Sequence, residues 1–379
     1  MGEPQSKTRK KMQNRITIKH VATRAGVSNQ LVSAVFSGRV SSVRCSEATR
    51  QKVLQAAADL GFRPNILAQS FRGSRSFLIG VINRVDLGWM SDRMLRGIQD
   101  GLVEAGLTPL LLTYQRDEGE DRNLNEFARR QVDGLIANVG TGQHERYGRM
   151  KEKGFPIMQV IDNSLAKFGI PNVMSDLVGA GAAATRHLLE LGHRRIAHLT
   201  HVRYLLNRDA HEYYLGYEGV MREAGLPPRV FTHSLDQYRL GEPYSFYDCA
   251  GEVVDEVLAE PRPTAVFCYE SFGAFRLIEA ATARGVAIPG ELAVVGINDM
   301  DVCRISKPMI STLRIDAYGI GKAAAGEIVS MLGGGTGCDH LIPTTLVARG
   351  SSVPGWVPPA PEQPPTSSPA KPAVRTASS

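Results

Sequence analysis

The chain has 379 residues, 43% of them apolar and 22% charged, a composition typical of a globular protein with two or three domains. No apolar run is long enough to span a membrane and none follows the N-terminal residues as in a secretory signal, so we expect neither an anchor nor export. Five scattered cysteines without a C-x-x-C spacing argue against a disulfide framework and favour a reducing cytoplasm.

The basic charge is concentrated at the N-terminus. Residues 1–76 contain 14 Lys or Arg and three acids, a net charge of +11, whereas the remaining residues contain 30 basic and 35 acidic residues, a net charge of −5. A basic module on a mildly acidic body is typical of a polyanion-binding protein. For residues 1–15 the same composition indicates a disordered basic tail.

Three short helices are predicted after this tail, over 18–25, 28–37 and 46–60. A hydroxyl residue stands at the start of each as a cap, and Gly26 and Gly61 follow the first and third helices. From Phe77 onward, apolar strands alternate with amphipathic helices, which predicts βαβ units and parallel sheets covered on both faces. The strands are expected at 77–82, 107–113, 134–138, 156–161, 195–200, 264–269 and 292–297. The helices are expected at 92–105, 120–131, 145–153, 178–191, 211–223, 249–258 and 272–284.

The second short helix, in "GVSNQLVSAVFSG", has two chemically different faces. At about 100° per residue, its apolar residues form one arc: Leu31, Val32, Val35 and Phe36. The opposite arc holds Asn29, Gln30, Ser33, Ala34 and Ser37. A helix that enters the major groove needs a narrow face without acids, and the amides of Asn and Gln can pair with the adenine edge. Together with the preceding helix and the turn at Gly26, this pattern predicts a helix-turn-helix.

Several segments carry a family resemblance. "TIKHVATRAGVSNQLVSAVFSG" and "SEATRQKVLQAAADLGFRPNILAQSFR" resemble the headpiece and hinge of LacI-family transcription regulators. "LRGIQDGLVEAG", "QVDGLI", "HLLELGHRRIAHL", "GYEGVMREAGL" and "PGELAVVGIND" resemble the periplasmic-binding-protein-like core of that family, so the likeness runs from Thr17 to about Arg349. It implies a homodimeric repressor that binds a double-stranded DNA operator and senses a small-molecule effector, such as a sugar or related metabolite, in a cleft between two lobes.

The resemblance also implies a division of the chain and a set of DNA contacts. The expected parts are a disordered tail (1–15), a helix-turn-helix domain (16–62), a hinge helix (63–75), a two-lobed α/β core (76–350) that changes lobe near 176–178 and 297–300, and a disordered Pro-rich tail (351–379). The expected DNA contacts are Thr17, Ser28, Asn29, Gln30, Ser33, Ala34, Arg39, Arg44, Asn65, Ala68 and Phe71.

Four positions in this part of the chain differ from the family, among them Leu31, which replaces a threonine that usually contacts the DNA backbone. Ala34 stands where the family usually has an arginine that reads guanine, and a methyl group offers only contact with a thymine methyl. His20 replaces an acid near the start of the first helix. Phe71 replaces the leucine that enters the minor groove; it either levers a base step open or packs on the core instead.

The effector contacts implied by the resemblance are Trp89, Met90, Asp176, Arg208, Tyr213, Glu270 and Asn298. Tyr213 stands in place of an arginine, Glu270 in place of an asparagine and Asn298 in place of an acid. Two interpretations stay open at this point: an effector of different chemistry, or loss of the response to small molecules.

Other classes of protein find little support. A solute-binding protein is disfavoured by the missing signal and the basic helix-turn-helix, and an enzyme by the lack of a nucleophile constellation. His193, His198 and His201 match no metal-ligand spacing, and the Gly-rich turn near Leu332 follows a helix rather than a strand, so we expect no metal and no cofactor.

Overall fold

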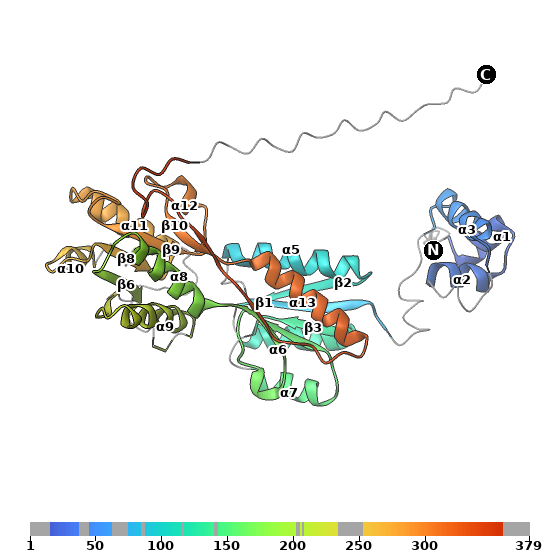
Figure 1. Ribbon diagram of the computed structural model, residues 1–379. Helices are drawn as coiled ribbons and strands as arrows, with labels where there is room; N and C mark the ends of the chain where they lie inside the picture. The colour runs from blue at the N-terminus through green and yellow to red at the C-terminus, as the bar shows by residue number, and fades with distance from the viewer. Residues whose placement is uncertain are drawn as a thin grey trace, which may run out of the picture.

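The computed structural model describes residues 16–37, 45–62, 75–84, 88–115, 117–139, 143–201, 205–206, 208–233 and 253–358 (Figure 1). The N-terminal part holds three helices, α1 (Ile18–Ala25), α2 (Asn29–Ser37) and α3 (Glu47–Asp59). Each contributes a fully buried valine to one small core: Val21, Val32 and Val53. The three predicted helices are present within one or two residues of the expected bounds.

Two α/β lobes follow (Figure 1). The elements of the first sheet and its helices are β1 (Leu78–Arg84), α5 (Gly88–Glu104), β2 (Thr108–Tyr114), α6 (Asp117–Arg129), β3 (Gly134–Ala137), α7 (His144–Glu152), β4 (Ile157–Val160), the 3-10 turn η3 (Ala166–Phe168), β5 (Asn172–Ser175), α13 (Ala317–Leu332) and β11 (His340–Ile342). The strand order is β11-β5-β4-β3-β1-β2. Its strands pair in parallel, with Leu78 opposite Thr108 where β1 meets β2.

The second lobe repeats this plan. Its elements are α8 (Leu177–Glu190), β6 (Ile196–His201), α9 (Arg208–Glu223), β7 (Arg229–His233), α10 (Val254–Leu258), β8 (Ala265–Cys268), α11 (Ser271–Ala283), β9 (Ala293–Ile297), α12 (Val302–Ile305), β10 (Ser311–Arg314) and β12 (Thr345–Val347). The strand order is β12-β10-β9-β8-β6-β7. Among the strand pairs of the described residues, β10–β12 alone is antiparallel.

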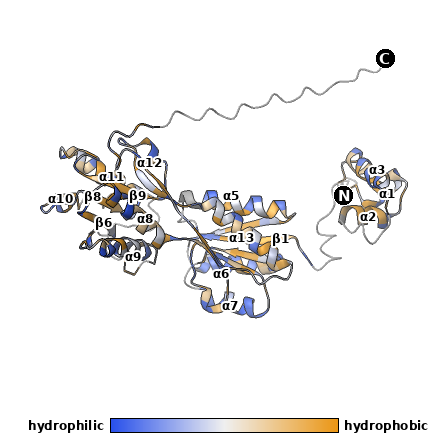
Figure 2. Cartoon of the chain, in the orientation of Figure 1, coloured by the Kyte–Doolittle hydropathy of each residue, from blue (hydrophilic) through white to orange (hydrophobic). Residues whose placement is uncertain are grey.

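Both sheets are buried between helices, as continuous apolar strands require. One apolar cluster joins α5 and α13 on the first sheet to α8 and α9 on the second. The opposite faces are covered by α6 and α7 in the first lobe and by α10 and α11 in the second. Figure 2 shows the strands as mainly hydrophobic and the outer sides of the helices as mainly hydrophilic. No helix in the described ranges is both long and apolar enough to cross a membrane.

The positions at which the chain changes lobe correct one prediction. The first change follows β5 at Asp176, as expected. The second was expected near 297–300, but β10 pairs with β9 in the second sheet, so the chain stays in that lobe until about 315–316. A further change lies at 343–344, between β11 and β12. The sequence "GIND" marks the end of β9. The chain then forms β10, which pairs with β9 in the same sheet, and only afterwards leaves the second lobe.

The expected start of the disordered tail, at residue 351, is also wrong. Ser351 and Ser352 are fully buried. Ser351 Oγ donates to the Val294 carbonyl at 2.6 Å and accepts the Ser311 N–H at 2.9 Å. These hydroxyls satisfy sheet groups that would otherwise be buried without a partner. Trp356 is half-buried and lies 3.6 Å from the Cβ position of Gly350, so the ordered chain reaches at least this side chain.

Candidate nucleic-acid interface and effector site

The turn between α1 and α2 depends on Gly26. Its φ of 67° lies in the left-handed region, which glycine adopts without a steric penalty from Cβ. The Val27 N–H closes the turn by donating to the Ala22 carbonyl at 3.0 Å. Ser28 then begins α2, because its Oγ accepts the Leu31 N–H at 3.2 Å. The predicted helix-turn-helix is therefore present with its cap.

The two sides of α2 differ as predicted at most positions. Val32 and Val35 are buried in the headpiece core, whereas Ser28, Asn29 and Gln30 are exposed. The helix contains no charged residue at all. Exposed amides on an acid-free helix supply paired donors and acceptors without repelling phosphate, which is what contact with base edges requires.

Ala34 is the exception on this helix. It was expected beside Asn29 and Gln30, but its exposed fraction is only 8%. On the helical wheel Ala34 borders the apolar arc at Leu31, so its methyl group lies at the edge of the buried side of α2. Ser33 is half-buried. The placement of Ala34 on the exposed face was therefore wrong, and its contact with a thymine methyl stays a prediction.

His20 closes the first turn of α1. The Thr17 N–H donates to His20 Nδ1 at 3.0 Å, and Thr17 Oγ1 lies 3.0 Å from the same nitrogen. A backbone N–H can only donate, so Nδ1 carries no proton and the neutral ring has its proton on Nε2. His20 thus fills the place of the glutamate in a capping box, and it adds no negative charge to a helix end predicted to meet phosphate.

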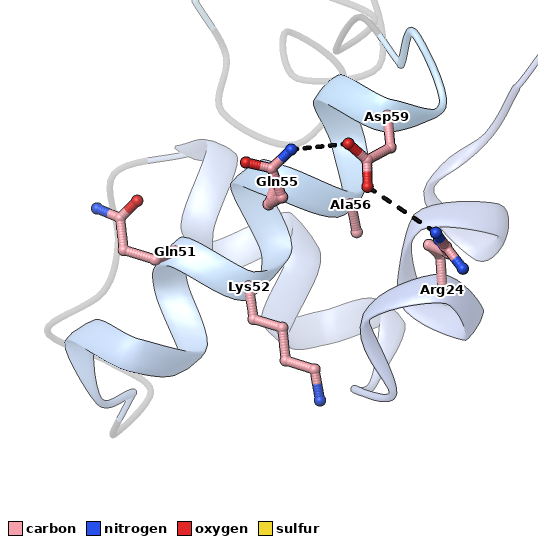
Figure 3. A pocket seen from close by; sticks show the side chains of 6 residues that line it. All are labelled: Arg24, Gln51, Lys52, Gln55, Ala56 and Asp59. Carbon is pink, nitrogen blue, oxygen red and sulfur yellow. Dashed lines mark hydrogen bonds and ion pairs between the residues drawn. The ribbon is translucent and has the colours of Figure 1, made fainter. Parts of the chain in front are cut away.

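A shallow hollow on the headpiece lies between α1 and α3 (Figure 3). It is lined by Arg24, Gln51, Lys52, Gln55, Ala56 and Asp59. Asp59 accepts a hydrogen bond from Gln55 at 2.7 Å and lies 4.0 Å from the guanidinium of Arg24. None of the predicted DNA contacts lines this hollow, and its acid is already paired, so it is explained as a solvated groove between two helices.

The remaining predicted DNA contacts lie outside the described residues: Arg39, Arg44, Asn65, Ala68 and Phe71. The same holds for the side chains of three predicted effector contacts, Trp89, Met90 and Arg208, although their backbones lie in the first turns of α5 and α9. Their roles stay predictions. The chain that leaves residues 63–74 is held to the first lobe by Asp133, whose carboxylate accepts the N–H groups of Ser76 and Phe77 at 2.8 and 2.7 Å.

The other predicted effector contacts stand at or beside the carboxyl edges of the two sheets, where open α/β sheets bind ligands. Asp176 follows β5, and its Oδ1 accepts the Gly179 N–H at 2.7 Å, so it caps α8. Asn298 follows β9, and Glu270 lies two residues after the end of the neighbouring strand β8. Tyr213 is buried in α9 with its ring centroid 5.9 Å from that of Tyr269. The structure thus brings three of them to one edge, in the second lobe.

Glu270 is chemically distinctive. Burial raises the pKa of its carboxyl to about 8. It precedes α11 at the N-cap position, yet its side chain makes no capping hydrogen bond. Asn298, nearby, has a φ of 78°, and its Oδ1 is buried without a hydrogen-bond partner.

Two histidines at the same edge were not predicted as site residues. His201 ends β6 and His233 ends β7, directly opposite each other in register. Both are buried, and burial together with the neighbouring His233 lowers the pKa of His201 to about 4. The signal available in the sequence was their place as the last residue of an apolar strand, because such residues lie at the carboxyl edge.

His198, one of the histidines weighed against a metal site, belongs to the lobe core. Its Nδ1 lies 3.0 Å from the Phe267 carbonyl, which can only accept, so Nδ1 carries the proton and Nε2 is unprotonated. The ring stacks on Phe267 and Tyr217, with centroids 4.9 and 5.5 Å apart. Burial lowers the pKa of His198 to about 4. In the described residues no group of three His, Cys, Asp or Glu side chains is arranged to hold a metal ion.

Asp299, next to Asn298, is a structural anchor. Its carboxylate receives Arg349 at 2.6 Å, Arg314 at 2.8 Å and Arg304 at 3.0 Å. Burial alone raises the pKa of this carboxyl, but the hydrogen bonds and charges of the arginines outweigh it and hold the pKa below its usual range. These three arginines, which lie near this end of the carboxyl edge, are therefore already paired with the Asp299 carboxylate.

Comparison with known proteins identifies two domains. Residues 17–65 match the family of bacterial regulatory proteins described as lacI, and residues 185–352 match the periplasmic binding protein-like domain. The chain therefore carries a LacI-family helix-turn-helix domain and a periplasmic-binding-protein-like domain. Catabolite control protein A of Priestia megaterium is 28% identical over 314 residues, covering 82% of this chain and 90% of that protein. The transcriptional repressor PurR of Photobacterium profundum is 26% identical, covering 81% and 89%.

Solved structures of LacI-family regulators share the fold. The lac repressor dimer bound to operator and the anti-inducer ONPF has a TM-score of 0.70 at 22% identity, covering 90% of this chain and all of that one. The CelR–cellobiose complex has a TM-score of 0.60 at 23% identity, covering 89% and 100%. A ribose-bound LacI-family regulator from Enterococcus faecium has a TM-score of 0.58 at 21% identity, covering 73% and 99%. The family matches and the curated relatives are transcription regulators rather than enzymes.

Proposed function

We propose that this protein is a sequence-specific repressor that binds its operator as a homodimer, and that a small-molecule effector at the carboxyl edges of the lobes changes its affinity for DNA. The observation that carries the proposal is α2, with Asn29 and Gln30 exposed on a helix that has no acid. The excess of basic residues in the first 76 supplies attraction to phosphate and predicts strongly salt-dependent binding. We also infer that the protein acts in the cytoplasm, on the nucleoid.

The effector part of the proposal is supported by the second lobe. Buried polar atoms normally have hydrogen-bond partners, and those left without one need an explanation such as a ligand. Asn298 Oδ1 and His201 Nδ1 lack partners at the carboxyl edge of this lobe in the part of the chain that the structure describes. Solved regulators of similar fold include complexes with cellobiose and with ribose. The two atoms without partners support a bound effector over loss of the response.

Selection of bound sites from random double-stranded DNA by the full-length protein tests the DNA part. We expect one pseudo-palindromic site, since a homodimer presents two copies of α2. Asn29→Ala and Gln30→Ala should each weaken binding to that site by about 1–3 kcal/mol and leave non-specific binding unchanged. Gln51→Ala is the matched control, because it removes an exposed amide from α3.

Two results would contradict the proposal. One is a selection that yields no preferred sequence. The other is a ratio of specific to non-specific affinity that is the same in Asn29→Ala, Gln30→Ala and Gln51→Ala, because the amides of α2 would then read no base.

A further inference from the structure

The carboxyl edge of the second sheet carries a row of polar and aromatic groups. Following the strand order from β10 to β7, the residues at this edge are Arg314, Asn298, Tyr269 with Glu270, His201 and His233. The ring centroid of Tyr269 lies 5.5 Å from that of His201 and 5.9 Å from that of Tyr213. Three rings, from the end of β6, the residue after β8 and α9, therefore meet at this edge, and Glu270 follows Tyr269 in the chain.

Some groups in this row lack a partner. His201 is 3% exposed and Asn298 Oδ1 is buried, yet neither His201 Nδ1 nor Asn298 Oδ1 has a hydrogen-bond partner in the described residues. The Glu270 carboxyl forms neither a hydrogen bond nor an ion pair there, although burial raises its pKa. Asn298 Oδ1 and an ionised Glu270 carboxylate are both acceptors, so what they lack is a donor.

The charges at the edge determine which donor fits. His201, with a pKa of about 4, is neutral near pH 7, and Arg314 donates its Nε–H to Asp299 at 2.8 Å. Glu270 therefore has no positively charged partner in the described residues. An anionic effector would meet a carboxyl group without a compensating positive charge, whereas a cationic effector would compensate Glu270 once that carboxyl gives up its proton.

We propose that the effector carries a protonated amine, which donates to Glu270 and Asn298 and lies against the rings of Tyr269 and His201. An ammonium group has only donors, so it satisfies both acceptors, and aromatic faces attract cations further. The inference rests on the proposed function, because it names the class of effector for the site proposed there.

Matched pairs of amines and alcohols test the class directly. The probes are putrescine against 1,4-butanediol, ethanolamine against ethylene glycol and D-glucosamine against D-glucose, each titrated into the full-length protein by calorimetry at pH 7. We expect at least one amine to bind tenfold or more tightly than its alcohol. Alcohols that bind as well as their amines, or a set in which no amine binds, would overturn the proposal.

The Glu270→Gln variant tests whether the tighter binding of amines depends on the Glu270 carboxyl group. The exchange is isosteric and removes no capping bond, so the fold should be retained. We expect tenfold or greater loss of affinity for the best amine and little change for its alcohol. Glu279→Gln is the matched control, because Glu279 is an exposed acid farther along α11 that pairs with Arg276. Equal losses in the two variants would show that Glu270 does not hold the amine.

The pH dependence separates an amine from a polyol. Below pH 8 the Glu270 carboxyl is mostly protonated, and a cation must displace that proton, so affinity for putrescine should rise up to about tenfold per pH unit toward pH 8. Of its neighbours, His201 titrates near pH 4, well below this range, and Tyr213 and Tyr269 are phenols. His233 is also present at the edge, so Glu270→Gln must abolish the rise. Affinity that falls toward pH 8, or a rise that persists in the variant, would refute the assignment.

Failure of this inference differs from failure of the proposed function. If the proposed class of effector is wrong, the full-length protein still selects a DNA site, and Asn29→Ala still weakens binding to it. If the proposed function is wrong, no DNA site is selected, whether or not an amine binds.

Discussion

Substitution of Gly321 by alanine should separate the two helices that cover the first sheet. A Cβ at Gly321 would lie 2.0 Å from the Met94 carbonyl oxygen and 2.8 Å from the Ile98 N, both backbone atoms of α5. Backbone cannot rotate away as a side chain can, so α5 and α13 must move apart. Overpacking of this kind costs about 1–3 kcal/mol, and the gain of about 1 kcal/mol in helix propensity offsets only part of it.

Gly326→Ala is the control on the same helix. No atom lies within 4 Å of a Cβ at Gly326, so this exchange should stabilise the protein by about 0.5–1 kcal/mol. Equilibrium unfolding in urea, followed by circular dichroism, should therefore give changes of opposite sign for two Gly→Ala exchanges on α13. A Gly321→Ala protein as stable as Gly326→Ala would refute the close approach of α5 and α13.

Other variants test the buried polar groups and the cap. Burial lowers the pKa of His198 to about 4, below the unfolded value near 6.5, so the unfolded chain takes up the proton first and stability is lost as pH falls from about 6.5 to 4. His198→Phe should lessen this loss by about 3 kcal/mol, as measured by urea unfolding across that range. Asp299→Asn should cost about 3–5 kcal/mol in the same assay at pH 7, because Arg349, whose side chain is 7% exposed, loses its charge partner. In α1, His20→Ala should lower headpiece stability by about 1 kcal/mol in thermal unfolding while His20→Gln lowers it less, since Gln can still accept the Thr17 N–H. Equal effects of the two exchanges would show that the cap contributes nothing.

The elements with strong local signals could be predicted from the sequence. Ser28 and Ser46 cap α2 and α3 as expected, because capping depends on a hydroxyl and an N–H three residues away. The strands β1, β3 and β9, buried over most or all of their length, are recognisable because covered parallel strands are largely apolar. The family resemblance extended these elements to a two-lobed core, which the structure confirms.

Other features depend on contacts between distant residues, which periodicity does not encode. The pairing of β10 with β9 moves the second lobe change from 297–300 to about 315–316. The strands β11 and β12, which have three residues each and are too short for a pattern, mark a further change at 343–344. Ala34 was misplaced because it lies at the border of two arcs, where periodicity alone does not decide burial. His201 was weighed for metal ligation and not for its place at the end of a strand, where register brings His233 beside it.

The helix α13 connects the proposed effector edge to the chain that comes from the headpiece. Its N-cap, Asp316, stands where the chain leaves the second lobe, two residues after Arg314 of the carboxyl edge. At its other end, the Leu332 carbonyl accepts a hydrogen bond from Arg75 at 2.6 Å, on the segment that leads from the headpiece into β1. A 16-residue helix, about 24 Å long, packs closely on α5 through backbone contacts at glycine. Both ends of α13 are therefore linked to the two parts that the proposed function requires to communicate, the effector edge and the chain from the headpiece.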